Sequence, residues 1–194
     1  MEHDRGGAEV PITVLFADVR GSTGMAEQVS AGEFKALLAR FYAQVTEAVR
    51  DEGGIIDKFL GDGVMALFIP SFTERRHAER RHAEHGLAAA RRILRGAELP
   101  IGIGLNSGEA FTGFLGPSAE VASFSAVGDA VNVAHRLGEA AGPGELIVSG
   151  DELDLAQPPS AQPDEEWSMR ELQVKGRERA VRGWSLRLRA AAAT

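Results

Sequence analysis

The order of strand-like and helix-like segments is the feature that most constrains the fold of this chain. A strand, a helix, a hairpin, a helix and a strand follow one another, and the hairpin is centred on Gly61-Asp62-Gly63. The segments that show these patterns are 12–18, 34–49, 55–59, 64–69, 73–95 and 100–105. This order predicts an α+β fold with a ferredoxin-like βαββαβ core, in which the helices lie on one face of a mostly antiparallel sheet.

The second half of the chain adds further elements to this core. The predicted elements are strands at 109–115, 123–127 and 146–148, a helix at 129–141, and a C-terminal hairpin formed by 172–174 and 182–188. The segment 151–167 is acidic and rich in proline, which predicts an exposed loop. We therefore expect one domain over 11–189, flanked by a flexible N-terminus over 1–10 and a frayed tail over 190–194.

Composition excludes several classes of protein. The chain has no cysteine, so disulfides and thiolate chemistry are excluded. Its net charge of −7 argues against a nucleic-acid partner bound through a broad basic surface, whereas a phosphate-bearing small molecule needs only local positive charge. No apolar stretch is long enough to span a bilayer, and Met1–Val10 lacks the apolar segment of a signal peptide. We expect a cytoplasmic protein with no membrane or nucleic-acid partner.

Asp18 and Asp62 are the candidate metal ligands. Asp18 ends the first predicted strand and Asp62 lies in the hairpin turn, so the predicted sheet places the two carboxylates where they can converge. Hard divalent cations take oxygen ligands, and paired carboxylates together with phosphate oxygens commonly hold Mg²⁺. Taken alone, each aspartate is also explained as an ordinary turn or strand-end residue.

The segment Arg20–Gly24 follows the first strand and has the composition of a tight loop before a helix. Small residues in such a loop leave backbone N–H groups accessible to phosphate. A phosphate contact is therefore predicted beside Asp18.

Four stretches of the chain together resemble the class III adenylyl/guanylyl cyclases of bacterial type. They are LFADVRGST (15–23), GGIIDKFLGDGVMALF (53–68), IGIGLNSGEAFTGFLG (101–116) and FSAVGDAVNVAHRL (124–137). Their order and spacing match the family, and the resemblance covers about 12–148, with a weaker similarity at 173–188. It implies an adenylate cyclase, a lyase that converts ATP to 3′,5′-cyclic AMP and pyrophosphate.

The resemblance implies a role for each residue that matches a family motif. Asp18 and Asp62, with the backbone carbonyl of Val19, match the ligands of two Mg²⁺ or Mn²⁺ ions in each active site. The residues that match the phosphate-binding loop are Gly21, Ser22 and Thr23. In the family, one ion helps to deprotonate the ribose 3′-hydroxyl and the other binds the triphosphate.

Lys58 and Ser125 match the two positions that read the purine. An ammonium donates to adenine N1, whereas guanine carries a proton on N1, so Lys58 favours ATP. Ser125 departs from the aspartate that is common at the second position. A serine hydroxyl accepts from the adenine amino group but can also donate to the guanine carbonyl, so a guanylate cyclase stays an alternative.

Asn132 and Arg136 match residues that act on the ribose and the α-phosphate. Asn132 matches the residue that orients the ribose, and Arg136 matches the one that stabilises charge on the α-phosphate. Lys175 resembles the lysine that grips the terminal phosphates, and Arg177 is a rival for that role.

The resemblance also implies how the site is assembled. In the family, the metal aspartates come from one subunit and the purine-reading, ribose and phosphate residues come from the other. This chain carries both sets, so we expect a head-to-tail homodimer with two equivalent sites. A catalytically silent nucleotide-binding module of the same fold is the main alternative.

Overall fold

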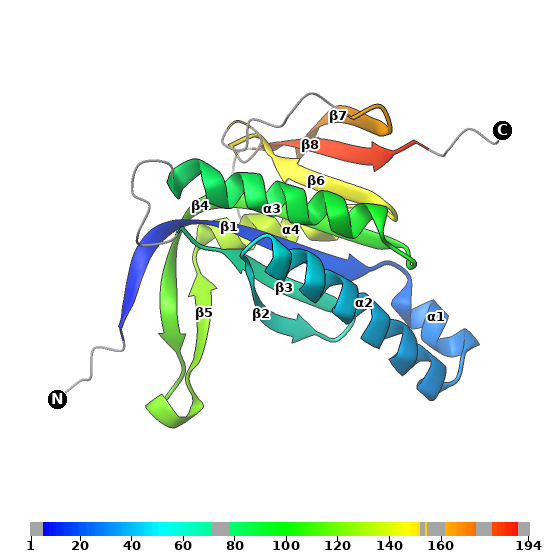
Figure 1. Cartoon of the computed structure of the whole chain (residues 1–194), viewed down its shortest axis with the longest axis horizontal. Helices are drawn as coiled ribbons and strands as arrows, with labels where there is room; N and C mark the ends of the chain where they lie inside the picture. The colour runs from blue at the N-terminus through cyan, green and yellow to red at the C-terminus, as the bar shows by residue number, and fades with distance from the viewer. Residues whose placement is uncertain (1–5, 71–77, 152–153, 155–161, 174–179, 190–194) are drawn as a thin grey trace.

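The computed structural model describes residues 6–70, 78–151, 154, 162–173 and 180–189 (Figure 1). Its elements are β1 (Gly7–Val19), α1 (Ser22–Gln28), α2 (Ala31–Asp51), β2 (Ile55–Leu60), β3 (Gly63–Phe68), α3 (Ala78–Arg95), β4 (Ile101–Leu115), the 3₁₀ turn η1 (Ala119–Val121), β5 (Ser123–Val127), α4 (Asp129–Ala140), β6 (Glu145–Ser149), β7 (Glu165–Leu172) and β8 (Val181–Leu188). In the described part of the chain, no helix is long and apolar enough to cross a membrane.

The strands form one sheet in the order β2-β3-β1-β4-β6-β8-β7, and β5 pairs with β4. β1 is antiparallel to both β3 and β4, and β4 pairs in parallel with β6. The first four strands and the helices α2 and α3 form the predicted βαββαβ core. β7 and β8 form a C-terminal hairpin, as predicted, but its first strand is 165–172 instead of the predicted 172–174. The predicted fold class is therefore confirmed.

The helices cover both faces of the complete sheet. α2 and α3 of the βαββαβ core pack on one face, against the β1 side chains Leu15 and Ala17. α4, which follows that core in sequence, packs on the opposite face, against Val14 and Phe16. Successive side chains of a strand point to opposite faces, so β1 is apolar on both sides because each side is covered.

Two predicted segments, the flexible N-terminus 1–10 and the exposed loop 151–167, each overlap the start of a strand. β1 begins at Gly7, inside the segment 1–10 expected to be flexible, because it pairs with β4 as far as Gly113. β7 begins at Glu165, inside the predicted exposed loop 151–167.

The Glu165 side chain is buried, and ion pairs to Arg91 and Arg95 of α3 hold it at 2.8 and 2.7 Å. The pairing partners of these segments are distant in sequence, so local composition does not reveal them.

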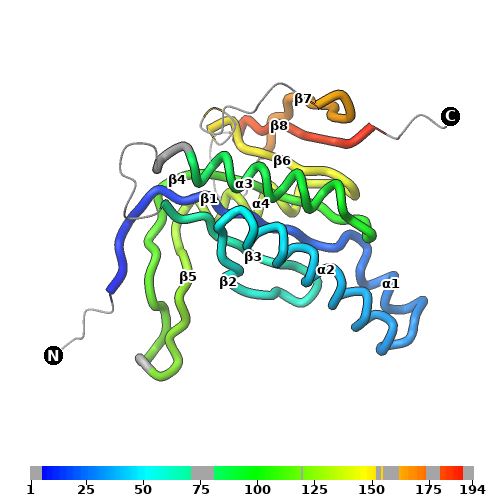
Figure 2. Tube along the Cα trace, viewed as in Figure 1, coloured from blue at the N-terminus to red at the C-terminus, as the bar shows by residue number. Residues whose placement is uncertain are grey.

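A long strand replaces two predicted ones at β4. The sequence predicts separate strands at 100–105 and 109–115, but one strand runs through both ranges and pairs along its length with β1. Its second half also pairs with β5, and this β4–β5 ribbon, bordered by the start of β1, projects from the rest of the sheet (Figure 2).

The contact between α4 and β4 requires glycine at Gly104. A Cβ atom there would lie 2.1 Å from the backbone nitrogen of Gly138 and 2.3 Å from the carbonyl oxygen of Ala134. Gly104→Ala is therefore expected to lower the free energy of unfolding by about 3 kcal/mol, because backbone atoms of α4 cannot move aside locally. Chemical denaturation measures this change.

The matched control is Gly32→Ala in the first turn of α2, where an added Cβ meets nothing within 4 Å. It should leave the stability unchanged or raise it slightly, because alanine favours the helix. A Gly104→Ala protein as stable as the control would contradict the close packing of α4 on β4.

Candidate active site

Asp18 and Asp62 lie together where β1 ends and the β2–β3 turn begins. Asp18 pairs in register with Gly63, and the backbone N–H of Val19 donates to the carbonyl oxygen of Asp62 at 3.1 Å. Burial raises the pKa of Asp18, and the negative charge of Asp62 raises it further. The sheet thus holds two carboxylates close enough to repel each other, as the sequence predicted.

This pair of carboxylates has the chemistry of a divalent-cation site. One oxygen of Asp18, Oδ1, is buried and has no hydrogen-bond partner in the described part of the chain. Arg20 compensates part of the negative charge of this pair. Its Nη1 lies 3.5 Å from Asp18 Oδ2, and its Nη2 donates to the Gly138 carbonyl oxygen at 2.6 Å. Clustered negative charge with an unpartnered oxygen fits a hard cation.

The described residues do not complete such a site on their own. Among them, no group of three or more His, Cys, Asp or Glu side chains could hold a metal ion. Mg²⁺ commonly binds one or two carboxylates and takes its other ligands from water and substrate phosphates, so two aspartates are compatible with it. Ligation of a metal ion by the Val19 carbonyl stays a prediction.

The predicted phosphate loop lies directly beside the carboxylates. Gly21 adopts a left-handed conformation with φ of 72° and precedes α1, whose first two residues are Ser22 and Thr23. The Ser22 hydroxyl donates to Asp62 Oδ2. The loop is therefore tied to the carboxylate pair in this structure, and its contact with phosphate stays a prediction.

Tyr42 of α2 supports the turn that carries Asp62, a role that the sequence did not reveal. Its hydroxyl donates to the carbonyl oxygen of Gly61, and its ring packs on Phe59 with centroids 4.6 Å apart. Burial raises the pKa of Tyr42, and the nearby Asp62 adds to the increase. Tyr42 is the sole tyrosine of the chain, but nothing in its sequence neighbourhood points to the turn.

The structure brings the two predicted purine-reading residues together. Lys58 of β2 donates through Nζ to the Ser125 hydroxyl oxygen of β5 at 3.1 Å, although 67 positions separate them in sequence. Both also contact Asp57, a residue that the sequence analysis missed. An acidic residue next to Lys58 inside a predicted strand was the available signal.

Asn132 and Arg136 lie one turn apart on α4, as predicted, and Asn132 is exposed. Arg136 pairs with Glu139 of the same helix at 2.5 Å. The two other candidates, Lys175 and Arg177, lie outside the described residues.

The cavity beside the carboxylate pair is small. Its volume is about 120 Å³, and it is lined by Asp18, Asp62 and their neighbours together with His135, Gly138 and Glu139 of α4. The described residues that line it do not include the purine pair, Asn132 or Arg136. Cavities that enclose a small-molecule ligand commonly have about 300–1,000 Å³, so this cavity is smaller than a typical nucleotide site.

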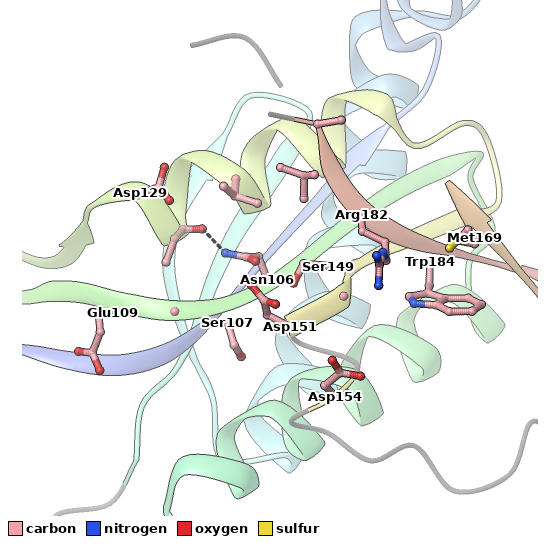
Figure 3. Close-up of a pocket in the computed structure, with 16 residues that line it drawn as sticks. Asn106, Ser107, Glu109, Asp129, Ser149, Asp151, Asp154, Met169, Arg182 and Trp184 are labelled. Atoms are coloured by element: carbon pink, nitrogen blue, oxygen red, sulfur yellow. Dashed lines mark hydrogen bonds between the residues drawn. The ribbon is translucent and has the colours of Figure 1, made fainter. Parts of the chain in front are cut away.

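A larger cavity of about 660 Å³ lies among β4, β6, β8 and the start of α4 (Figure 3). Its lining includes the acidic residues Glu109, Asp129, Asp151 and Asp154, and one basic residue, Arg182. This excess of negative charge does not suit a triphosphate. Neither Asp18 nor Asp62 lines it.

The sheet topology and the paired aspartates at the β1 end and the β2–β3 turn place the chain in the class of nucleotide cyclase catalytic domains. The sequence pattern of the family described as "Adenylate and Guanylate cyclase catalytic domain" matches residues 8–187. The chain belongs to this family, whose members bind a nucleotide, generally use divalent metals and typically dimerise.

Solved structures agree with this assignment. The adenylyl cyclase CyaB from P. aeruginosa superposes with a TM-score of 0.76 at 25% identity, covering 97% of this chain and 99% of that one. The guanylyl cyclase Cya2 superposes with a TM-score of 0.73 at 26% identity, covering 97% and 98%. Both substrate classes therefore occur among the similar structures.

Curated relatives are longer than this chain. An adenylate cyclase of Anabaena cylindrica is 31% identical over 135 residues, which are 65% of this chain and 26% of the relative. An uncharacterized protein of Mycobacterium tuberculosis is 33% identical over 186 residues, covering 91% of this chain and 33% of the relative. The chain thus spans between a quarter and a third of the length of these relatives.

Proposed function

We propose that this chain is an adenylate cyclase that converts ATP to 3′,5′-cyclic AMP and pyrophosphate. The observation that carries the proposal is the contact between Lys58 and Ser125, which places an ammonium beside a hydroxyl that can accept from the adenine amino group. Lys58 donates to adenine N1, a position at which guanine presents a proton instead of a lone pair. We also propose the cytoplasm as its location, where ATP is available.

Asp18 and Asp62, with the Val19 carbonyl, are the groups that would hold two Mg²⁺ or Mn²⁺ ions. When bound, such ions lower the pKa of the ribose 3′-hydroxyl and neutralise charge on the phosphates. Backbone hydrogen bonds of the sheet join β1 to the β2–β3 turn and so hold the two carboxylates in position. Backbone N–H groups of Gly21, Ser22 and Thr23 would bind phosphate oxygens.

The remaining residues would position the nucleotide for in-line attack of the ribose 3′-oxygen on the α-phosphorus. Asn132 would orient the ribose, and Arg136 would stabilise the charge that develops on the α-phosphate. Lys175 or Arg177 would contact the terminal phosphates. Pyrophosphate then leaves opposite the attacking oxygen.

We infer that two chains share each site in a head-to-tail homodimer. The small carboxylate cavity, which lacks the purine pair, Asn132 and Arg136, supports this arrangement. Exposed apolar side chains on β2 and on the β4–β5 ribbon supply a surface for a second copy. They are Ile55, Phe59, Leu60, Phe111, Phe114, Phe124 and Val127.

The proposal is tested by incubating the purified protein with ATP or GTP, each with Mg²⁺ and with Mn²⁺, and separating the products. Cyclic AMP and pyrophosphate from ATP are expected, with GTP turned over more slowly. Preferential formation of cyclic GMP would make the chain a guanylate cyclase. A folded dimer that releases neither product would favour the silent nucleotide-binding module.

A further inference from the structure

Asp57 is a buried carboxylate at the purine-reading pair. Its side chain is 0% exposed, although β2 is an edge strand of the sheet. Asp57 Oδ2 lies 3.0 Å from Lys58 Nζ and accepts a hydrogen bond from the Ser125 hydroxyl, also at 3.0 Å. Lys58 Nζ in turn lies 3.1 Å from Ser125 Oγ, so the three groups form a closed triangle.

A bulge in β2 makes this triangle possible. The pairing with β3 passes from Ile56, opposite Ala66, to Lys58, opposite Met65, so Asp57 is an extra residue. Neighbouring residues of a regular strand point to opposite faces, but a bulge redirects a side chain. The carboxylate and the ammonium therefore reach the same hydroxyl of β5.

The triangle fixes the polarity of the Ser125 hydroxyl. An ionised carboxylate only accepts hydrogen bonds and an ammonium only donates them, so the hydroxyl proton points to Asp57 and one lone pair faces Lys58. The remaining lone pair of Ser125 can accept a hydrogen bond, but the hydroxyl has no proton left to donate. Ser125 thus has an acceptor for an amino group and no donor for a carbonyl.

Lys58 and Ser125 each keep a hydrogen-bonding group for the adenine base. The Lys58 ammonium has three N–H groups and uses two of them on Asp57 and Ser125, and its side chain is 45% exposed. Ser125 is only 3% exposed, so a base reaches its hydroxyl only after the flexible side chain of Lys58 moves aside. Asp57 holds the hydroxyl proton in either position of Lys58.

We propose that Asp57 is a positioning residue that sets the preference for adenine over guanine by keeping the Ser125 hydroxyl an acceptor. This inference rests on the proposed adenylate cyclase function and deepens it. An adenine carries an amino group where a guanine carries a carbonyl, so a hydroxyl that only accepts discriminates between them. Serine, ambiguous by itself, becomes selective through its buried neighbour.

The test is the ratio of kcat/KM for ATP to kcat/KM for GTP in Asp57→Asn. The asparagine amide can donate to Ser125 Oγ and release its proton toward the base, so the ratio is expected to fall about tenfold. In a Ser125→Ala background the same change should leave the ratio unaltered, because no hydroxyl remains to be oriented.

The matched control is Glu165→Gln, which neutralises another buried carboxylate, one that pairs with Arg91 and Arg95 far from the purine pair in sequence. It should lower thermal stability and leave the ratio unchanged. A purely structural Asp57 would behave like this control, with equal losses for both nucleotides, and that result would overturn the proposal.

Ser125→Ala provides a second route if Asp57→Asn does not fold. A hydroxyl fixed as an acceptor predicts a loss of ATP turnover with GTP turnover unchanged, whereas equal losses overturn the inference. If the wild-type protein releases no product, competition binding measures the ratio of ATP affinity to GTP affinity for each variant, and this ratio replaces the kinetic one. A wild-type preference for GTP refutes both proposals, and a cyclic AMP-forming enzyme with an unchanged ratio in Asp57→Asn refutes only the role of Asp57.

Discussion

Asp18→Asn is expected to reduce the formation of cyclic AMP roughly a thousandfold while the protein stays folded. The substitution keeps the size of the side chain and removes one of the two negative charges at the end of β1. Burial and the charge of Asp62 raise the pKa of Asp18, so ionising this carboxyl costs more in the folded chain than in the unfolded one. Neutral asparagine should therefore not lower the free energy of unfolding.

The measurement is turnover of ATP at saturating Mg²⁺, together with chemical denaturation of the same sample. Asp51→Asn is the control, because this exposed aspartate at the end of α2 pairs only with Arg92 among the described residues. It should keep full activity. An Asp18→Asn protein with near-normal turnover would show that the carboxylate pair does not hold the ions.

Arg136→Ala is expected to lower kcat by about 100- to 1,000-fold with little change in KM. The guanidinium would act on charge that develops only in the transition state, so its loss should affect the chemical step more than binding. Stability should change little, because the ion pair of Arg136 with Glu139 is partly exposed and lies within one helix.

Steady-state kinetics with ATP measure this change, and Arg40→Ala is the control. Arg40 is an exposed arginine that pairs with Glu98 at 3.0 Å. If Arg136→Ala raised KM and left kcat unchanged, Arg136 would be a binding residue and not a stabiliser of the transition state.

The core of the fold could be predicted because its signals are local. The two glycines around Asp62 and the apolar run that ends at Asp18 each depend on neighbouring residues. The start of α2 is also local, because the structure forms a capping box between Ser30 and Glu33. Their order along the chain then defines the βαββαβ arrangement.

Features that depend on distant partners could not be predicted in this way. The start of β1 at Gly7 depends on pairing with Gly113, and the start of β7 at Glu165 depends on arginines of α3. The position of α4 on the opposite face depends on Gly104, whose lack of a side chain is informative only once the helix is seen to pack there.

The candidate site shows the same division. Motif spacing identified Asp18, Asp62, Lys58 and Ser125, because each lies within a stretch that resembles the family. Asp57 was missed because its role requires both the bulge in β2 and the approach of β5. Its position next to Lys58 was a signal, but neither the bulge nor the approach of β5 can be read from the sequence.

Mixing of inactive subunits tests the central claim, a nucleotide site shared by two chains, most directly. Asp18→Asn and Arg136→Ala proteins are each nearly inactive in the account given above, but a mixed dimer contains one site with both native residues. Half of the dimers in an equal mixture would be mixed after exchange, so cyclic AMP formation should recover to about a quarter of the wild-type rate. Exchanging, folded dimers that stay inactive when mixed would contradict the shared site.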